Sequence, residues 1–198
     1  GEGFWTGTLV DFIRLAGCPV RCPWCDTGYQ EGGKGLPSVA RSIAQLLAEL
    51  QSPRVVITGG EPFIHRDLPE LVAALLAADK QVSIETSGAY WQDVSPQAWI
   101  TLSPKEHVSS KYPVQERFWT RANEIKLVVS TGKEVDYYHN HLSSNVDIPV
   151  FLHQSVSDSN MCSVVNDAIA LIERNTKIHF VTYNNHADYI QIRIGDTG

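Results

Sequence analysis

The apolar positions of the chain fall into short runs that alternate with longer, helix-like segments. Runs rich in Val, Ile, Leu and Phe that are bounded by Gly, Pro or polar residues are typical of buried strands. By this pattern the sequence predicts strands at residues 8–15, 54–58, 81–85, 99–102, 124–129, 148–152 and 177–182. Strands are therefore expected along the whole chain.

Three of the intervening segments have the pattern of a helix. One helix is predicted over residues 38–50, with Ser38 as its N-cap, and others over residues 68–78 and 164–174. One face of the first helix carries the apolar residues Ile43, Leu46, Leu47 and Leu50. Each predicted helix follows one strand and precedes another.

Strands separated by helices predict a parallel sheet, because parallel neighbours need a crossover connection, which is nearly always right-handed. Roughly six such units are too few to close an eight-stranded barrel. We therefore predict an α/β fold, a partial, open β/α barrel of about six parallel strands. One domain is predicted over residues 1–198, with a divergent tail at residues 183–198 and a strand preceding Gly1 that the numbered sequence lacks.

Polar motifs follow most of the predicted strands. β/α barrels place their working residues at the carboxyl ends of the strands. The motifs found at these ends are Cys18 to Thr27, Thr58 to Pro62, Glu85 to Gly88, Ser103 to Lys105, and His153 with Gln154. The sequence thus predicts one site, built at the carboxyl edge of the sheet.

Cys18, Cys22 and Cys25 form a C-x3-C-x2-C cluster. A four-iron, four-sulfur cluster normally takes one thiolate per iron, so three thiolates leave one iron open for chemistry. Structural zinc also uses closely spaced cysteines, but it needs a fourth ligand, and Cys162 lies far along the chain. A disulfide between two of these three cysteines would link positions that are already close in the sequence, and it would leave the third cysteine unpaired. The spacing favours iron–sulfur, with zinc as the alternative.

The length and composition of the chain agree with one enzyme domain that has a single hydrophobic core. The chain has 198 residues, of which 43% are hydrophobic, and no apolar run approaches the roughly 18 residues of a membrane span. A formal charge of -6 argues against a protein that grips nucleic acid through its phosphates. We expect no nucleic-acid or membrane partner, and a reducing cytoplasm as the location that suits exposed thiols.

The cysteine cluster, with Trp24 directly before its last cysteine, resembles the signature of the radical S-adenosylmethionine (SAM) superfamily. The resemblance implies that SAM chelates the open iron, and that its reductive cleavage gives a 5′-deoxyadenosyl radical. Thr58-Gly-Gly-Glu-Pro62 resembles the segment that binds the amino group of SAM in that superfamily. Taken alone, this segment would be interpreted as a tight strand-to-helix turn.

Further motifs resemble the 7-carboxy-7-deazaguanine synthase family, over about residues 1–155. They are Gly1-Glu-Gly3, Phe12-Ile-Arg14, Cys25-Asp-Thr27, Ile84-Glu-Thr-Ser-Gly88, Ser103-Pro-Lys105 and Asn123-Glu-Ile-Lys126. The resemblance implies conversion of 6-carboxy-5,6,7,8-tetrahydropterin to 7-carboxy-7-deazaguanine with release of ammonia, in the pathway to queuosine and other 7-deazapurines. The alternatives are a glycyl-radical-enzyme activating protein and a non-catalytic zinc-binding module.

The resemblance also implies a role for each motif residue, with the cofactor-derived radical rather than a side chain as the catalyst. The metal ligands are Cys18, Cys22 and Cys25 for the 4Fe–4S cluster and Thr27 for Mg²⁺. Substrate-binding residues are Gly1, Glu2, Gly3, Arg14, Thr58 and Glu85. SAM-binding residues are Trp24, Cys25, Asp26, Gly59, Gly60, Glu61, Ser103, Pro104, Lys105 and Gln154.

Two of these roles agree with simple chemistry. The forked guanidinium of Arg14 suits a substrate carboxylate in a way that lysine cannot reproduce, although a surface salt bridge is the alternative interpretation. The hydroxyl of Thr27 suits a hard cation, although Asp26 and Thr27 would by themselves be interpreted as a turn and cap.

The resemblance implies two partners, a flavodoxin or ferredoxin-type reductant and a second copy of the chain. Candidates for the dimer contact are Trp119, Tyr137 and Tyr138, with a modest local core as the alternative interpretation. The family's tail ends in a Gln-Thr-His-Lys-like segment, whereas this chain reads Thr182-Tyr-Asn-Asn-His186, so His186 is at most a displaced counterpart. His139 and His141 are predicted to be surface residues.

Overall fold

The computed structural model describes residues 3–5, 7–30, 32–106, 110–129, 150–154, 178–182 and 189–194. The chain divides into two compact units, Gly1–Arg121 and Ala122–Gly198. Within the described ranges, no helix has the length and apolar character needed to cross a membrane. The prediction of a single domain over residues 1–198 stays a prediction.

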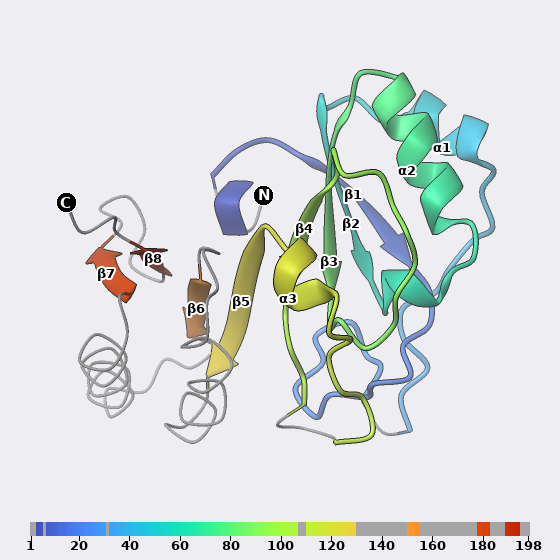
Figure 1. Ribbon diagram of the computed structural model, residues 1–198. Coiled ribbons are helices and arrows are strands. Elements are labelled where there is room, and N and C mark those ends of the chain that lie inside the picture. The colour runs from blue at the N-terminus through green and yellow to red at the C-terminus, as the bar shows by residue number, and fades with distance from the viewer. Residues whose placement is uncertain are drawn as a thin grey trace. The chain divides into compact units, whose positions relative to one another are not determined.

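The first unit contains a parallel sheet in the order β1-β2-β3-β4 (Figure 1). Its strands are β1 (Asp11–Leu15), β2 (Arg54–Gly59), β3 (Gln81–Thr86) and β4 (Trp99–Leu102). All four were predicted, and only the first begins later than expected. There Thr8 bonds the carbonyl oxygen of Trp5 through both its N–H, at 3.0 Å, and its hydroxyl, at 2.7 Å. This turn keeps Thr8 out of the ladder.

Five helices lie among the described residues of this unit. Of these, α1 (Ile43–Glu49), η2 (Pro62–Ile64) and α2 (Leu68–Ala77) lie between strands of the sheet, whereas η1 (Gly3–Trp5) precedes β1 and α3 (Phe118–Arg121) follows β4. The predicted N-cap Ser38 is wrong, because Ser42 caps α1. The Ser42 hydroxyl accepts from the N–H of Gln45 at 3.2 Å, and the Gln45 side chain accepts from the N–H of Ser42 at 2.8 Å. This reciprocal capping box satisfies two donors that a helix end would otherwise leave open.

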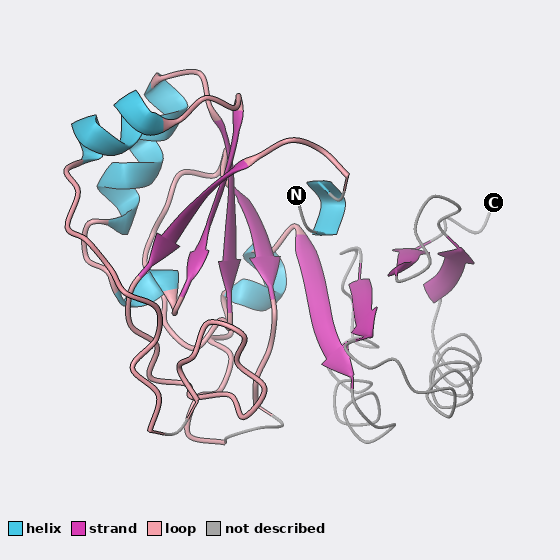
Figure 2. Ribbon diagram, turned by 180° about the vertical axis from the view of Figure 1, so that it is seen from behind, coloured by secondary structure: helices cyan, strands magenta, loops and turns pink. Residues whose placement is uncertain are grey.

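The two faces of the first sheet differ in polarity, because successive residues of a strand point to opposite faces. One face is apolar and includes four residues with no exposed surface, Val55, Ile57, Ile84 and Ile100. The α2 helix contacts β3 and buries its own apolar residues, Leu68, Leu71, Val72 and Leu75. The strands point toward the end of the sheet where the long loops gather (Figure 2).

The second unit contains β5 (Glu124–Val129), β6 (Val150–Gln154), β7 (Ile178–Thr182) and β8 (Tyr189–Ile194). β5 and β6 pair in parallel, whereas β8 lies between β6 and β7 and is antiparallel to both. The predicted strands at residues 124–129, 148–152 and 177–182 are therefore present, but β7 lacks the parallel neighbour that we expected. β8 was missed altogether. The helix predicted at residues 164–174 lies outside the described residues.

Candidate active site

The loop after β1 carries the three cysteines. Cys18, Cys22 and Cys25 are free thiols, each half-buried. Burial raises the pKa of the Cys18 and Cys22 thiols, and the charge of Cys25 adds to both shifts. Opposing these effects, backbone hydrogen bonds from Val20 and Arg21 lower the pKa of Cys18. Because these backbone donors stabilise the charged form of the sulfur, they suit a bound group that requires several thiolates at once.

This donor set fits an iron–sulfur cube better than a single ion. Among the described residues, no three His, Cys, Asp or Glu side chains are arranged to hold one metal ion. In a cube each thiolate binds a different iron, so the sulfur atoms do not converge on one point. Three free thiols on one loop therefore match the cluster that the sequence predicts.

Three part-buried hydrogen bonds anchor the cysteine loop. The hydroxyl of Tyr29 accepts a 2.7 Å bond from the N–H of Gly17, and the N–H of Tyr29 donates to the sulfur of Cys25 at 3.4 Å. The ring Nε2 of His65 donates to the carbonyl oxygen of Ala16 at 2.8 Å. Sequence reasoning identified neither Tyr29 nor His65 as a support of this loop. A tyrosine within the cysteine loop was the available signal.

The Gly59-Gly60 turn packs directly on the beginning of that loop. The N–H of Gly60 donates to the carbonyl oxygen of Leu15 at 2.8 Å, and the N–H of Glu61 donates to that of Gly17 at 2.9 Å. A Cβ atom at Gly60 would lie 1.8 Å from the Gly17 oxygen, and one at Gly59 would lie 2.3 Å from the Leu15 oxygen. The glycines thus allow two backbones to touch, which places the turn beside the cysteines.

Glu61 is buried, with 2% of its surface exposed. Its Oε1 accepts from the N–H of Phe63 at 3.1 Å and from the hydroxyl of Thr86 at 2.7 Å. Its Oε2 accepts from the N–H of Ser87 at 2.9 Å and from the hydroxyl of Ser87 at 2.5 Å. The carboxylate joins the end of β2 to the end of β3.

Four polar side chains form a row across the carboxyl half of the sheet. Arg14 is in register with Thr58, and Glu85 with Thr101. The hydroxyl of Thr58 donates to Oε2 of Glu85 at 2.9 Å, which joins the two pairs. Arg14 is exposed and its guanidinium lies 5.6 Å from the ring centre of Phe12. Sequence reasoning found three members of this row and missed Thr101.

Aromatic residues lie one step below this row on the same face. Trp99 precedes Thr101 by two positions on β4, and its ring stacks on that of Phe4 with 4.6 Å between the ring centres. Phe12 holds the corresponding position on β1. A planar ligand held by the polar row would therefore meet an apolar surface beside it.

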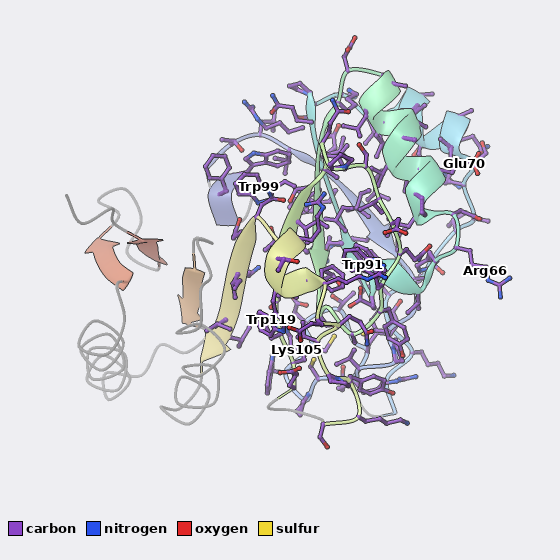
Figure 3. The ribbon with its side chains drawn as sticks, viewed as in Figure 1. Arg66, Glu70, Trp91, Trp99, Lys105 and Trp119 are labelled. Carbon is purple, nitrogen blue, oxygen red and sulfur yellow. The ribbon has the colours of Figure 1, made fainter. Side chains whose placement is uncertain are left out.

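The remaining residues of the motifs lie on the loops. Thr27 is buried, and its hydroxyl donates to Oδ1 of the exposed Asp26 at 3.0 Å. The ammonium group of Lys105 donates to the carbonyl oxygen of Ser103 at 2.6 Å and to its hydroxyl at 2.5 Å. Its charge lowers the pKa of the Cys22 thiol, although burial raises that pKa more. Lys105 is labelled in Figure 3.

The structure describes only some of the other residues that the sequence analysis predicted. Trp24 is exposed, Pro104 is buried, and Gly3 begins η1. Gln154 is the last residue of β6, in the second unit. The predictions for Gly1, Glu2, Tyr137, Tyr138, His139, His141, Cys162 and His186 lie outside the described residues.

The sequence and the structure were compared with those of known proteins. Residues 12–95 match the model of the radical SAM superfamily. That segment holds the cysteine loop, the Gly59-Gly60 turn and the end of β3. The match therefore covers the three thiols and three members of the polar row, Arg14, Thr58 and Glu85, but not Thr101.

Curated relatives match the chain over a greater length than the family model does. The chain is 40% identical to 7-carboxy-7-deazaguanine synthase from Aquifex aeolicus over 68% of its own length and 64% of the relative's. With 7-carboxy-7-deazaguanine synthase from Escherichia coli the identity is 36%, over 74% of this chain and 75% of the relative. The chain thus spans about two thirds to three quarters of these relatives.

Solved structures agree with the fold. A crystal structure of QueE from Escherichia coli matches with a TM-score of 0.71 at 31% identity, over 88% of this chain and 86% of that one. The structure of archaeal TYW1 matches with a TM-score of 0.53 at 11% identity, which concerns the fold alone. The predicted open α/β architecture is confirmed.

Proposed function

Since the chain belongs to the 7-carboxy-7-deazaguanine synthase family of radical SAM enzymes, we propose that it converts 6-carboxy-5,6,7,8-tetrahydropterin to 7-carboxy-7-deazaguanine with release of ammonia. One observation carries the proposal: the cysteine loop, the Gly59-Gly60 turn and the Arg14–Thr58–Glu85 row lie at one end of a single parallel sheet. A 4Fe–4S cluster and SAM, the cofactors of this superfamily, supply the radical chemistry when bound.

In this proposal Cys18, Cys22 and Cys25 hold the cluster. The turn at Gly59 and Gly60 binds the amino group of SAM, and its contact with the cysteine loop supports this role, because a ligand of the open iron must reach both. Trp24, Asp26, Ser103, Pro104 and Lys105 contribute to the rest of the SAM site, and the role of Gln154 stays a prediction. The exposure of Trp24 and the effect of the Lys105 charge on the pKa of Cys22 support the roles of these two residues.

The polar row binds the pterin. Arg14 receives the substrate carboxylate, and Glu85 accepts from the adjacent N–H groups of the pyrimidine edge. The hydroxyl of Thr58 donates to Glu85, which holds that carboxylate in one orientation. The stacked pair of Phe4 and Trp99 provides an apolar surface for the ring system. Gly1, Glu2 and Gly3 complete the site.

The test is an anaerobic assay. Reconstituted, reduced protein is incubated with SAM, Mg²⁺ and the carboxytetrahydropterin, and the deazaguanine product and ammonia are quantified. We expect both products in equal amounts. SAM cleavage without deazaguanine would remove the proposed substrate and leave the superfamily assignment intact.

Substitution of Arg14 by lysine tests the carboxylate contact. Lysine keeps the charge but loses the planar fork, so we expect the KM for the pterin to rise by about tenfold or more, with the Kd for SAM unchanged. Arg66→Lys is the control, because Arg66 is exposed and points away from the sheet in Figure 3. Equal losses of pterin and SAM binding in the Arg14 variant would mean that the arginine has only a structural role.

We also propose that Thr27 binds Mg²⁺ together with the substrate carboxylate. Its hydroxyl proton is directed at Asp26, so the lone pairs of the oxygen stay available to a cation. A hydroxyl oxygen is a ligand that Mg²⁺ accepts, and the ion readily takes substrate oxygens and waters around a small protein contribution.

Replacement of Thr27 by alanine tests the magnesium site. We expect the stimulation of turnover by Mg²⁺ to fall from its wild-type value by about tenfold, because the ion then keeps only its substrate and water ligands. Thr27→Ser retains the hydroxyl and should retain most of the stimulation. Unchanged Mg²⁺ dependence in the alanine variant, measured by titration of the ion, would place the metal on other residues.

The proposed setting is the cytoplasm, with a flavodoxin or ferredoxin-type protein as reductant and a homodimer as the working form. The three free thiols support a reducing compartment. Half-buried Trp119 on α3 supports the dimer contact. Light scattering of the holoenzyme distinguishes the dimer from a monomer.

A further inference from the structure

Arg21, between the first two cysteines, has a backbone conformation that residues other than glycine rarely adopt. Its φ is +61°, and among the described residues Asp79 is the other non-glycine residue with a positive φ. Asp79 directly follows the end of α2. There its N–H donates to the carbonyl oxygen of Leu76 and that of Lys80 to Leu75, each at 3.0 Å, an arrangement that ends many helices. Arg21 lies in a loop, so its conformation needs a different explanation.

The backbone and the side chain of Arg21 bond different parts of the chain. Its N–H bonds the sulfur of Cys18. Its guanidinium Nη1 donates to the carbonyl oxygen of Gly33, twelve positions along the chain, at 2.7 Å. Both bonds form while the residue holds its positive φ. Arg21 therefore joins the cysteine loop to the segment that contains Gly33.

Gly33 belongs to a segment that folds back on itself. It comprises the described residues 28–30 and 32–35, and we call it the brace segment. The N–H of Gly35 donates to the carbonyl oxygen of Gly28 at 2.9 Å. A Cβ atom at Gly33 would lie 2.2 Å from the same oxygen, so glycine is required for this close approach. The fold of the brace segment thus fixes the carbonyl oxygen that Arg21 bonds.

The buried Tyr29 joins the brace segment to the cysteine loop a second time. Its hydroxyl accepts from the N–H of Gly17 at 2.7 Å, and its N–H donates to the sulfur of Cys25 at 3.4 Å. The outer two thiols, Cys18 and Cys25, therefore receive N–H groups from Arg21 and Tyr29, and the same two residues join the loop to the brace segment. This arrangement supports the loop without any bound group.

We infer that Arg21 is a positioning residue, whose guanidinium bond to Gly33 keeps the cysteine loop closed and so slows the release of the cluster. The inference rests on the proposed 4Fe–4S cluster at Cys18, Cys22 and Cys25. The bond compensates for the unfavourable backbone conformation, which explains an arginine at an exposed loop position where glycine would be less strained.

The experiment replaces Arg21 by glycine, which loses the guanidinium but adopts a positive φ at no steric cost. Anaerobically reconstituted protein is mixed with an excess of the iron chelator bathophenanthroline disulfonate, and the rate of iron release is followed. We expect release roughly fivefold faster than from the wild type, the factor for one lost hydrogen bond. The midpoint of thermal unfolding should not fall, because the relieved backbone strain offsets the lost bond.

Three further variants separate the bond from other effects. Arg21→Lys keeps a charged donor on a long side chain, so it should restore part of the slow release. Asp79→Gly relieves the other positive φ, at the end of α2, and should release iron at the wild-type rate. Lys34→Ala removes an exposed positive charge next to Gly33 and should also leave the rate unchanged.

Three results would overturn the inference. Wild-type release from Arg21→Gly would show that the bond does not hold the loop, and equal acceleration in Lys34→Ala would make positive charge the cause. Faster release together with a lower unfolding midpoint would make general stability the cause. Failure of the proposed reaction is a separate result, because deazaguanine would then be missing while the release rates of the variants still differed.

Discussion

Replacement of Gly60 by alanine will abolish SAM binding and product formation. The added Cβ would lie 1.8 Å from the carbonyl oxygen of Gly17, 2.4 Å from its carbonyl carbon and 3.1 Å from the N–H nitrogen of Cys18. All three are backbone atoms, so no side chain can turn aside to make room. The turn must separate from the cysteine loop, and a displacement of about 1 Å costs roughly a hundredfold at a positioned site.

The measurement is the Kd for SAM on protein with full iron content, followed by turnover. Gly32→Ala is the control on the same cysteine loop, because a Cβ there would have no atom within 4 Å. Gly32 has a φ of +78°, so alanine should cost about 1–2 kcal/mol of stability through backbone strain and leave SAM affinity intact. A Gly60 variant with wild-type SAM affinity would show that the turn is not where SAM binds.

The strands could be predicted because their burial leaves a local signature. Residues 55–57, Val-Val-Ile, are buried on both faces of the sheet, which gives a continuous hydrophobic run within β2. β8 escaped prediction although residues 189–194 alternate apolar and polar positions, the pattern of a half-buried strand. The expectation of a parallel sheet left no place for an antiparallel strand in the tail.

Helix boundaries depend on contacts that composition does not contain. Ser38 and Ser42 are equivalent as residues, but only Ser42 lies three positions before Gln45, which completes the capping box. That signal was present in the sequence. The prediction used the length of the apolar face and therefore began the helix one turn too early.

The motif residues of the site were visible from their chemistry, whereas their supports required the register of the strands. Thr101 belongs to the polar row only because it is paired with Glu85 on the neighbouring strand. Likewise, the donors to Glu61 lie on β3 and just beyond it, 25 and 26 positions along the chain. Sequence reasoning therefore identified Glu61 as a motif residue but could not identify the protein groups that bond it.

Replacement of Cys22 by alanine is the second substitution with a large expected effect. Without the Cys22 thiolate, the cluster keeps only two protein ligands. The iron that Cys22 would have bound is then open to solvent and oxygen. The charge of Lys105 near Cys22 would then have no thiolate to balance it. We expect anaerobically reconstituted Cys22→Ala to lose most of its iron and sulfide and to cleave no SAM.

Cys162→Ala is the matched control, because Cys162 is the fourth cysteine of the chain and stands outside the C-x3-C-x2-C cluster. It should retain about four irons and four sulfides per chain, together with full SAM cleavage. The outcome also decides between metals, since a zinc module would need a fourth ligand beyond the three clustered thiols. If Cys162→Ala lost its metal as completely as Cys22→Ala, four cysteines would share one site, and no iron would be left open for SAM.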